Sequence, residues 1–138
     1  MKTVSIILVT LLCTIASVYG QVAVIVNKSI TEESVDAGTL GKMYNFKEKK
    51  WNNGDKVVLF VLKENDAVRD KFYEFIGESH TQLRNTWMKV QLTGGGKAPE
   101  ALKTEAEMLQ KVSSTPGAIG FVSADKVDDS VKVIAKIE

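Results

Sequence analysis

Three uninterrupted runs of apolar residues constrain the fold of this chain more than any other feature. They lie at residues 22–26 (VAVIV), 57–62 (VVLFVL) and 118–122 (AIGFV). A strand with one face in water alternates apolar and polar residues, and these runs do not alternate. They therefore predict strands that are covered on both faces, as in a parallel sheet between layers of helices.

Apolar residues between these runs recur at the spacing of amphipathic helices, one helix after the first run and three after the second. The predicted helix starts are Asp36, Asn65 or Asp66, Ser79 with Gln82 three residues later, and Pro99. The predicted buried faces are Leu40, Met43 and Tyr44; Val68, Phe72, Phe75 and Ile76; Leu83, Trp87 and Val90; and Leu102, Ala106, Leu109 and Val112. Gly77 is expected to end the second helix.

A fourth strand is expected at residues 131–137 (VKVIAKI), where Lys132 and Lys136 among apolar residues are typical of a half-exposed edge strand. The element order is then strand, helix, strand, three helices, strand and strand. Such alternation predicts a layered α/β domain with right-handed crossovers. We therefore expect a single domain whose mixed, mostly parallel sheet is flanked by helices.

Three residues around the third apolar run are expected to have particular backbone roles. Pro116 stops the preceding helix, and Gly117 permits a positive φ. Gly120 lies inside the strand, where the lack of a side chain predicts that another segment approaches closely.

The first 20 residues have the pattern of a signal peptide. Lys2 supplies the positive start, the apolar run after it is too short to span a bilayer comfortably, and Val18 and Gly20 occupy the positions that a signal peptidase reads. We therefore expect a signal peptide at residues 1–20, cleavage near Gly20, and a periplasmic or secreted domain at residues 21–138. The alternative is that the segment is kept as a membrane anchor.

Cleavage would remove Lys2 and Cys13, the only cysteine. Of the 18 basic residues, 17 would remain against 17 acidic ones, and the net charge would be zero. Balanced charge argues against a nucleic-acid partner, which needs a basic excess. Without a thiol the domain has no disulfide, and about 118 residues suffice for one core but not for two.

No pattern in the sequence supports an enzyme. His80 is the only histidine and has no recognisable catalytic or zinc-binding partners, and no serine lies in a Gly-x-Ser-x-Gly motif. Asp125, Asp128 and Asp129 lack the spacing of a calcium loop. We therefore expect a non-enzymatic protein with no catalytic residue, no metal and no cofactor.

The most glycine-rich stretch is TGGGKAPE at residues 93–100. It lacks the spacing of a phosphate loop. The amides of Gly94 and Gly95 and the Lys97 ammonium are nevertheless candidates to contact an anion at the start of the helix predicted from Pro99. A flexible connector is the alternative for this stretch.

Five segments, in order, carry a resemblance to a known family: VAVIVNKSI, LGKMYNFKEKKW, AVRDKFYEFIG, LRNTWMKVQLTGGGKAP and STPGAIGFV. Their order and spacing, from about Val22 to Ile137, resemble the periplasmic phosphate-binding proteins of ABC transporters and their short single-domain relatives. The resemblance implies a fold like one lobe of a type II periplasmic binding protein. It also implies phosphate or a similar small anion as ligand, and a transporter component or another envelope protein as partner.

In full-length members of that family, a ligand loop reads Ser-Gly-Thr-Arg at a helix start, with a Phe shortly after it. The resemblance places Asp66, Ala67, Val68, Arg69 and Phe72 at the matching positions. The Arg and the Phe are retained, whereas the two hydroxyls and the glycine are not.

The carboxylate of Asp66 would oppose an anion bound at this loop, since two like charges about 5 Å apart repel by roughly 3 kcal/mol at an effective dielectric of 20. We therefore expect a domain that holds phosphate weakly, or as half of a cleft. The alternative is an envelope interaction module that has lost solute binding; the oligomeric state is left open. The candidate ligand-binding residues are Lys63, Asn65, Asp66 and Arg69, followed by Gly94, Gly95 and Lys97.

Overall fold

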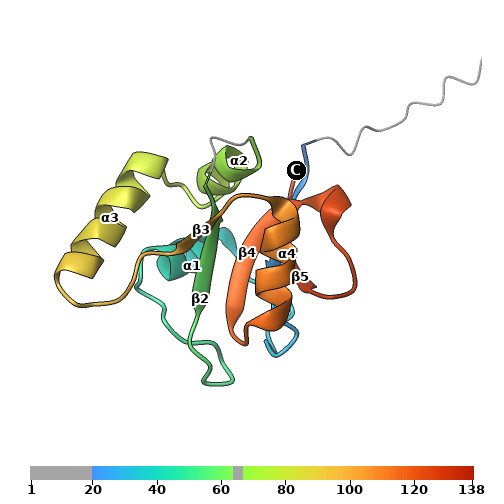
Figure 1. The fold of residues 1–138 in the computed structure, drawn as a ribbon, viewed down its shortest axis with the longest axis horizontal. Helices are drawn as coiled ribbons and strands as arrows, with labels where there is room; N and C mark the ends of the chain where they lie inside the picture. Colours follow the sequence, from blue (N-terminus) through green and yellow to red (C-terminus); the bar gives the residue numbers. More distant parts are fainter. Residues whose placement is uncertain (1–19, 64–66) are drawn as a thin grey trace, which may run out of the picture.

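The predicted apolar runs form the centre of a five-stranded sheet in the computed structural model, which describes residues 20–63 and 67–138 (Figure 1). The elements in chain order are β1 (Val22–Val26), α1 (Ala37–Tyr44), β2 (Val58–Leu62), α2 (Ala67–Phe75), α3 (His80–Leu92), β3 (Glu100–Leu102), α4 (Glu105–Ser114), β4 (Ala118–Ser123), a 3-10 turn η1 (Ala124–Lys126) and β5 (Lys132–Ile137). All of β1 and nearly all of β2 and β4 are buried, as continuous apolar runs predict.

The strands lie in the order β3-β2-β4-β1-β5. Strand β2 runs parallel to β3 and β4, whereas β1 runs antiparallel to β4 and β5. The sheet is therefore mixed and mostly parallel, as predicted, since β2, β3, β4 and β5 run in one direction and only β1, between β4 and β5, runs in the opposite one. Strand β5 lies at one edge, which confirms the edge position predicted from its two lysines.

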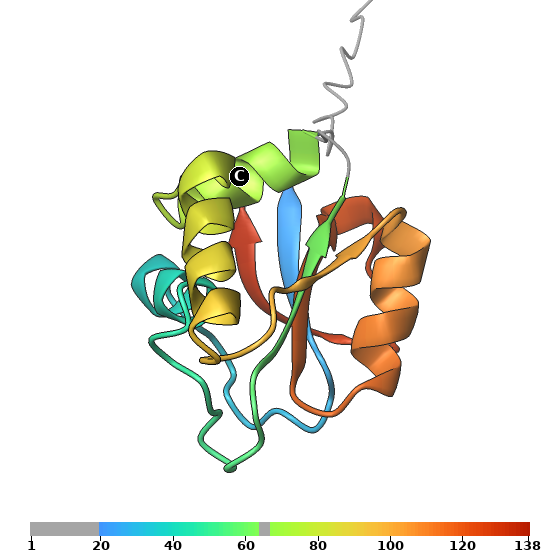
Figure 2. The same cartoon turned by 60° about the vertical axis from the view of Figure 1, so that its left-hand side comes forward.

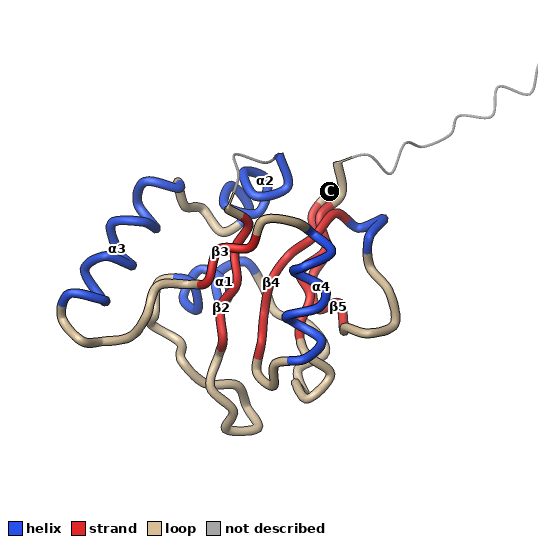
Figure 3. The backbone as a smooth tube through the Cα atoms, in the orientation of Figure 1, coloured by secondary structure: helices blue, strands red, loops and turns tan. Residues whose placement is uncertain are grey.

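Helices α1 and α2 cover one face of the sheet and α4 covers the other (Figures 1 and 3). The ring of Phe72 on α2 stacks on Phe121 of β4 with 4.2 Å between centroids and lies edge-on to Tyr44 of α1 at 5.0 Å. The adjacent residue of β4, Gly120, faces Met108 of α4. Successive residues of a strand point to opposite faces, so β4 is packed on both sides.

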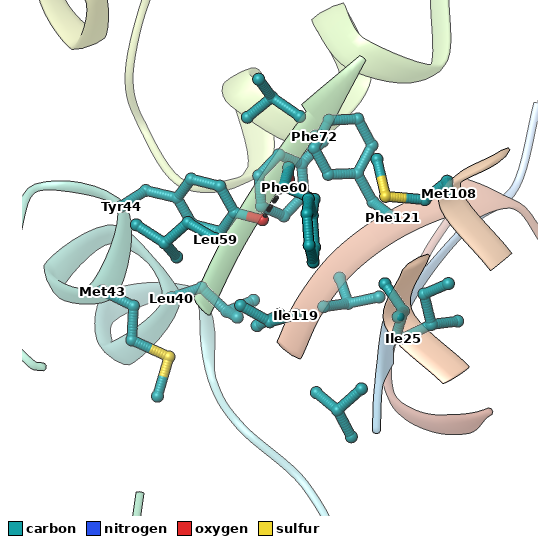
Figure 4. Packing of buried hydrophobic residues seen from close by; sticks show 14 of the residues in the cluster. Ile25, Leu40, Met43, Tyr44, Leu59, Phe60, Phe72, Met108, Ile119 and Phe121 are labelled. Carbon is teal, nitrogen blue, oxygen red and sulfur yellow. Dashed lines mark hydrogen bonds between the residues drawn. The ribbon is translucent and has the colours of Figure 1, made fainter. Parts of the chain in front are cut away.

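Figures 1 and 2 show helix α3 to the side of this core. Its buried apolar residues attach it. Leu83 and Trp87 are buried, and the Trp87 Nε1–H donates to the Tyr44 carbonyl oxygen at 2.7 Å. The Tyr44 hydroxyl in turn donates to the carbonyl oxygen of Phe60 in β2 at 2.9 Å (Figure 4). A chain of buried hydrogen bonds therefore links α3 to the sheet through α1.

Three predicted helix boundaries are confirmed by hydrogen bonds or backbone geometry. The Asp36 side chain accepts from the Thr39 amide at the start of α1. Ser79 and Gln82 form the reciprocal pair of a capping box at the start of α3. Gly77 follows α2 with a φ of 74°, a conformation that favours glycine.

The predicted start of the fourth helix at Pro99 is wrong. Residues 100–102 form β3 instead, and α4 begins after Thr104, whose side chain accepts from the Glu107 amide at 3.1 Å. In α4, Met108 is buried, whereas Ala106, which the sequence predicted to be buried, is exposed. Leu102, assigned to this helix from the sequence, packs in the sheet beside Leu62.

Candidate functional site

The carboxyl ends of β2, β3 and β4 lie at one edge of the sheet, where α2 and α4 begin. Ligands of open α/β sheets bind outside the carboxyl ends of the strands. Of the candidate anion-binding residues that follow β2, Lys63 and Arg69 lie at this edge. Asn65 and Asp66 lie outside the described residues, and the expected effect of the Asp66 carboxylate stays a prediction.

Arg69 is at this edge, but its side chain is buried, with 6% of its surface exposed. Its Nη1 donates to the Lys63 carbonyl oxygen at 3.2 Å, and its Nε lies 3.8 Å from the Asp70 carboxylate. Its guanidinium carbon lies 5.8 Å from the centre of the Tyr73 ring, within cation–π range. The arginine that matches the family pattern therefore packs on Tyr73 of its own helix, α2, and donates a hydrogen bond to the residue that follows β2.

The backbone of Lys63 is also hydrogen-bonded within the fold. Its side chain is exposed, but its backbone amide donates to the Leu102 carbonyl oxygen at 2.8 Å and belongs to the pairing between β2 and β3. Only the ammonium of Lys63 is therefore placed to meet a solute.

The start of α4 supplies two carboxylates to the same edge, and sequence reasoning missed them. Glu107 Oε2 accepts from the Lys103 amide at 3.2 Å, and Glu105 Oε1 accepts from the Ser123 amide at 2.7 Å. The sequence signal for them is Thr104 followed by Glu107, which has the spacing of a capping box and marks a later helix start than Pro99. The amides of Lys103, just before α4, and of Ser123, at the end of β4, are therefore bonded to side chains of α4.

The glycine stretch does not join this site. In the parallel register, Glu100 lies beside Phe60 and Leu102 beside Leu62, so Lys97 and Lys63 lie near opposite ends of β2. About six residues of strand separate these levels, or roughly 20 Å. The candidate residues predicted from the sequence thus fall into two separate places.

The amides of the glycine stretch also have another role. The Gly95 amide donates to the Val90 carbonyl oxygen at 2.9 Å, and the Gly94 amide donates to that of Gln91. Gly94 has a φ of 75°, so the stretch ends α3 in the way that glycines end helices. This geometry agrees with the connector interpretation and not with an anion site at a helix start.

His80 lies on the surface, and its ring is parallel to that of buried Tyr73 at 6.0 Å between centroids. Partial burial, together with the positive charges of Arg69 and Arg84, lowers the pKa of His80. Burial raises the pKa of Tyr73 to about 12.

Among residues 20–63 and 67–138, no three His, Cys, Asp or Glu side chains are placed to hold a metal ion, and no helix is long and apolar enough to cross a bilayer.

Comparisons with known proteins find no matching family model and no matching curated sequence, whereas solved structures match clearly. A protein from Clostridium perfringens, described as a phosphate ABC transporter substrate-binding protein with bound phosphate, superposes with a TM-score of 0.68 at 20% identity, over 82% of this chain and 43% of that one. An ABC-type phosphate transport receptor from Vibrio cholerae gives 0.66 at 19%, over 82% and 44%. PstS from Borrelia burgdorferi gives 0.61 at 14%, over 84% and 47%.

These TM-scores establish a shared fold, and this chain spans less than half the length of each matched protein. The likeness agrees with the family resemblance of the five sequence segments. The α/β unit with its mixed five-stranded sheet therefore has the fold of one lobe of the phosphate ABC transporter substrate-binding proteins.

Proposed function

We propose that this protein is an exported, non-enzymatic binding domain, derived from one lobe of a phosphate receptor, that does not hold phosphate tightly on its own. The observation that carries the proposal is the occupation of the carboxyl edge by the chain's own groups. Glu105 accepts from the Ser123 amide at the end of β4, Glu107 accepts from the Lys103 amide just before α4, and the Arg69 guanidinium is buried against the Lys63 carbonyl.

The electrostatic cost to a bound phosphate follows from these positions. An anion about 5 Å from one carboxylate is repelled by roughly 1–3 kcal/mol, depending on how far water screens the pair. Both glutamates are only half-buried, so the lower part of this range applies to each. Together they weaken phosphate by about tenfold or more, since about 1.4 kcal/mol is a factor of ten in affinity.

One lobe also offers only one wall to a ligand. Small-molecule sites normally enclose most of their ligand's surface. This chain spans less than half of the matched receptors, so a full cleft would require a second lobe beyond the described residues. In that arrangement, this domain would supply one half of the cleft that holds phosphate or another small anion.

Export is the second part of the proposal. Cleavage after Gly20 would leave β1 intact, because this strand begins at Val22. The Gln21 carbonyl oxygen, which accepts from the Ala124 amide at 2.9 Å, would also stay with the mature domain.

Calorimetric titration of the purified protein with phosphate, with sulfate as a second anion, tests the binding proposal. We expect no saturation by phosphate below millimolar concentrations. The variant Glu105→Gln/Glu107→Gln keeps the oxygen acceptors but removes both charges, and we expect it to bind phosphate at least fivefold more tightly. The matched control Glu33→Gln/Asp129→Asn makes the same charge change at exposed positions after β1 and before β5, at the opposite end of the strands. Micromolar phosphate affinity that none of these variants alters would refute the proposal.

The alternative function is an interaction module of the cell envelope, and one observation favours it. Helix α3 stands away from the sheet and exposes Met88 (51%) and Leu92 (84%), one turn apart. Substituting both by lysine should abolish capture of an envelope partner that the wild-type protein captures. Gln91→Lys with Thr81→Lys, on exposed positions of the same helix, is the control. Equal capture by both variants would remove this alternative.

A further inference from the structure

A groove with a volume of about 760 Å³ opens beside the first half of β2, away from the carboxyl edge. Three segments form most of it: residues 46–50 after α1, residues 56–60 leading into and along β2, and residues 95–100 before β3; Met43, Lys111 and Thr115 complete the lining. This volume is within the range of pockets that hold small organic molecules. The groove is therefore a second candidate site, independent of the edge where α2 and α4 begin.

The groove exists because the outer side of β2 is covered by two different segments. Strand β3 pairs only with Phe60–Leu62, while the Val57 amide donates to the Lys49 carbonyl oxygen at 2.9 Å. Between them the chain at residues 95–99 closes on Phe46. A Cβ on Gly96 would lie 3.4 Å from the Phe46 ring, so a glycine lets this wall approach closely.

The floor of the groove is apolar and remains accessible. It includes Phe46, Val57, Val58 and Pro99, all of them half-buried, next to the buried Leu59. Apolar surface that stays in contact with water gains free energy when another apolar group covers it. The floor therefore suits the hydrocarbon part of a ligand.

The rim of the groove is strongly basic. Its charged residues are Lys49, Lys50, Lys56, Lys97 and Lys111 against Glu48 and Glu100. Among the described residues, only Lys111 in this set forms an ion pair, at 3.8 Å from Glu100. The Lys49 ammonium lies 3.5 Å from the carbonyl oxygen of Gly95, an uncharged acceptor. The rim therefore has an excess of positive charge that its own carboxylates do not neutralise.

Two of these lysines are placed directly against each other. Lys50 and Lys56 are partners in an antiparallel bridge, so their side chains leave the same face at neighbouring positions. Like charges directly opposite in such a pair are destabilising. An anion between the two ammonium groups would remove this repulsion and gain from both charges.

We propose that this groove binds an amphipathic organic anion: a single-chain carboxylate whose hydrocarbon part lies on the floor beside Phe46 and Leu59, and whose carboxylate lies between Lys50 and Lys56. Inorganic phosphate matches only the rim and leaves the floor uncovered. A neutral or cationic chain would cover only the floor. The repulsion between Lys50 and Lys56 would then remain. The groove therefore selects for the combination of a chain and a negative head.

Titration of the purified protein with decanoate, followed by calorimetry and by amide NMR shifts, tests this proposal. Decyltrimethylammonium supplies the chain with the opposite charge, and inorganic phosphate supplies the charge without the chain. The variant Lys50→Gln/Lys56→Gln removes the paired ammonium groups. Lys126→Gln/Lys136→Gln is the matched control, because both lysines are exposed on η1 and β5, at the far edge of the sheet.

We expect saturable decanoate binding, with the largest shifts at residues 46–50 and 95–100. The affinity should fall at least tenfold in Lys50→Gln/Lys56→Gln and less than twofold in Lys126→Gln/Lys136→Gln. Absence of decanoate binding by the folded protein would overturn the proposal. So would equal loss in the two variants, equally tight binding of the cationic chain, or displacement of decanoate by equimolar phosphate.

Discussion

Substitution of Gly120 by alanine tests how α4 is seated on the sheet. A Cβ at this position would lie 2.4 Å from Met108 Sδ and 3.2 Å from Val112 Cγ2. Carbon and sulfur atoms in proteins normally contact at about 3.5–4.0 Å. Met108 must therefore move by about 1 Å within a core where none of its surface is exposed. Overpacking of this kind costs about 1–3 kcal/mol of unfolding free energy.

Urea unfolding followed by Trp fluorescence measures this cost, and a double-mutant cycle with Met108→Ala identifies its origin. Met108→Ala alone should cost about 2–5 kcal/mol because it leaves a cavity. In the double variant the methyl group introduced by Gly120→Ala occupies part of that cavity. The combined cost should therefore be at least about 1 kcal/mol smaller than the sum of the single costs.

Gly38→Ala provides the control for a general effect of replacing glycine. Gly38 lies in α1, is exposed, and a Cβ there would meet only Asp36 Oδ1 at an ordinary 3.6 Å. This change should stabilise the protein by about 0.5–1 kcal/mol, since alanine is the better helix former. A neutral Gly120→Ala, or additivity of the two core changes within about 0.5 kcal/mol, would refute the close packing of α4 on β4.

Two further predictions concern His80 and Asn27. Because partial burial and neighbouring arginines lower the pKa of His80, NMR titration should place it below its ordinary value of 6.5, and Arg84→Gln should raise it. The unfolded chain then binds the proton more readily, so this contribution to stability is present above pH 6.5 and is lost as the pH falls below it. Asn27 donates from Nδ2 to the carbonyl oxygens of Val112 at 2.9 Å and Ser113 at 3.1 Å. Asn27→Ala should cost about 2–3 kcal/mol in urea unfolding, whereas Asn53→Ala on the exposed turn should cost less than about 1 kcal/mol.

The sequence features that predicted the fold correctly are those set by local physics. Continuous apolar runs identified β1, β2 and β4, because a strand buried on both faces cannot alternate. Asp36 and the pair Ser79 and Gln82 identified helix starts, because their side chains accept from amides within three residues. Gly120 marked a close approach, because only a missing side chain admits Met108 there.

The features that the sequence did not reveal depend on pairing between distant segments. Glu100–Leu102 has no strand pattern of its own and is held by β2, whose register fixes it. The position of β1 between β4 and β5 is likewise set by long-range hydrogen bonds. For the same reason the groove could not be predicted, since it joins residues after α1, along β2 and before β3.

Glu105 and Glu107 on α4 add negative charge to the edge of the sheet for which the sequence predicts repulsion of an anion by Asp66. A helix start exposes amide donors, and a receptor can satisfy such donors with its anionic ligand. In this chain Glu105 and Glu107 accept from the amides of Ser123 and Lys103. The contact of Glu105 satisfies the half-buried Ser123 amide from within, and an unpaired buried donor would cost about 1–3 kcal/mol, whereas the Lys103 amide is at the surface. Under the proposed function, the charge of Glu105 would therefore weaken phosphate binding, while its contact with Ser123 stabilises the lobe without a ligand.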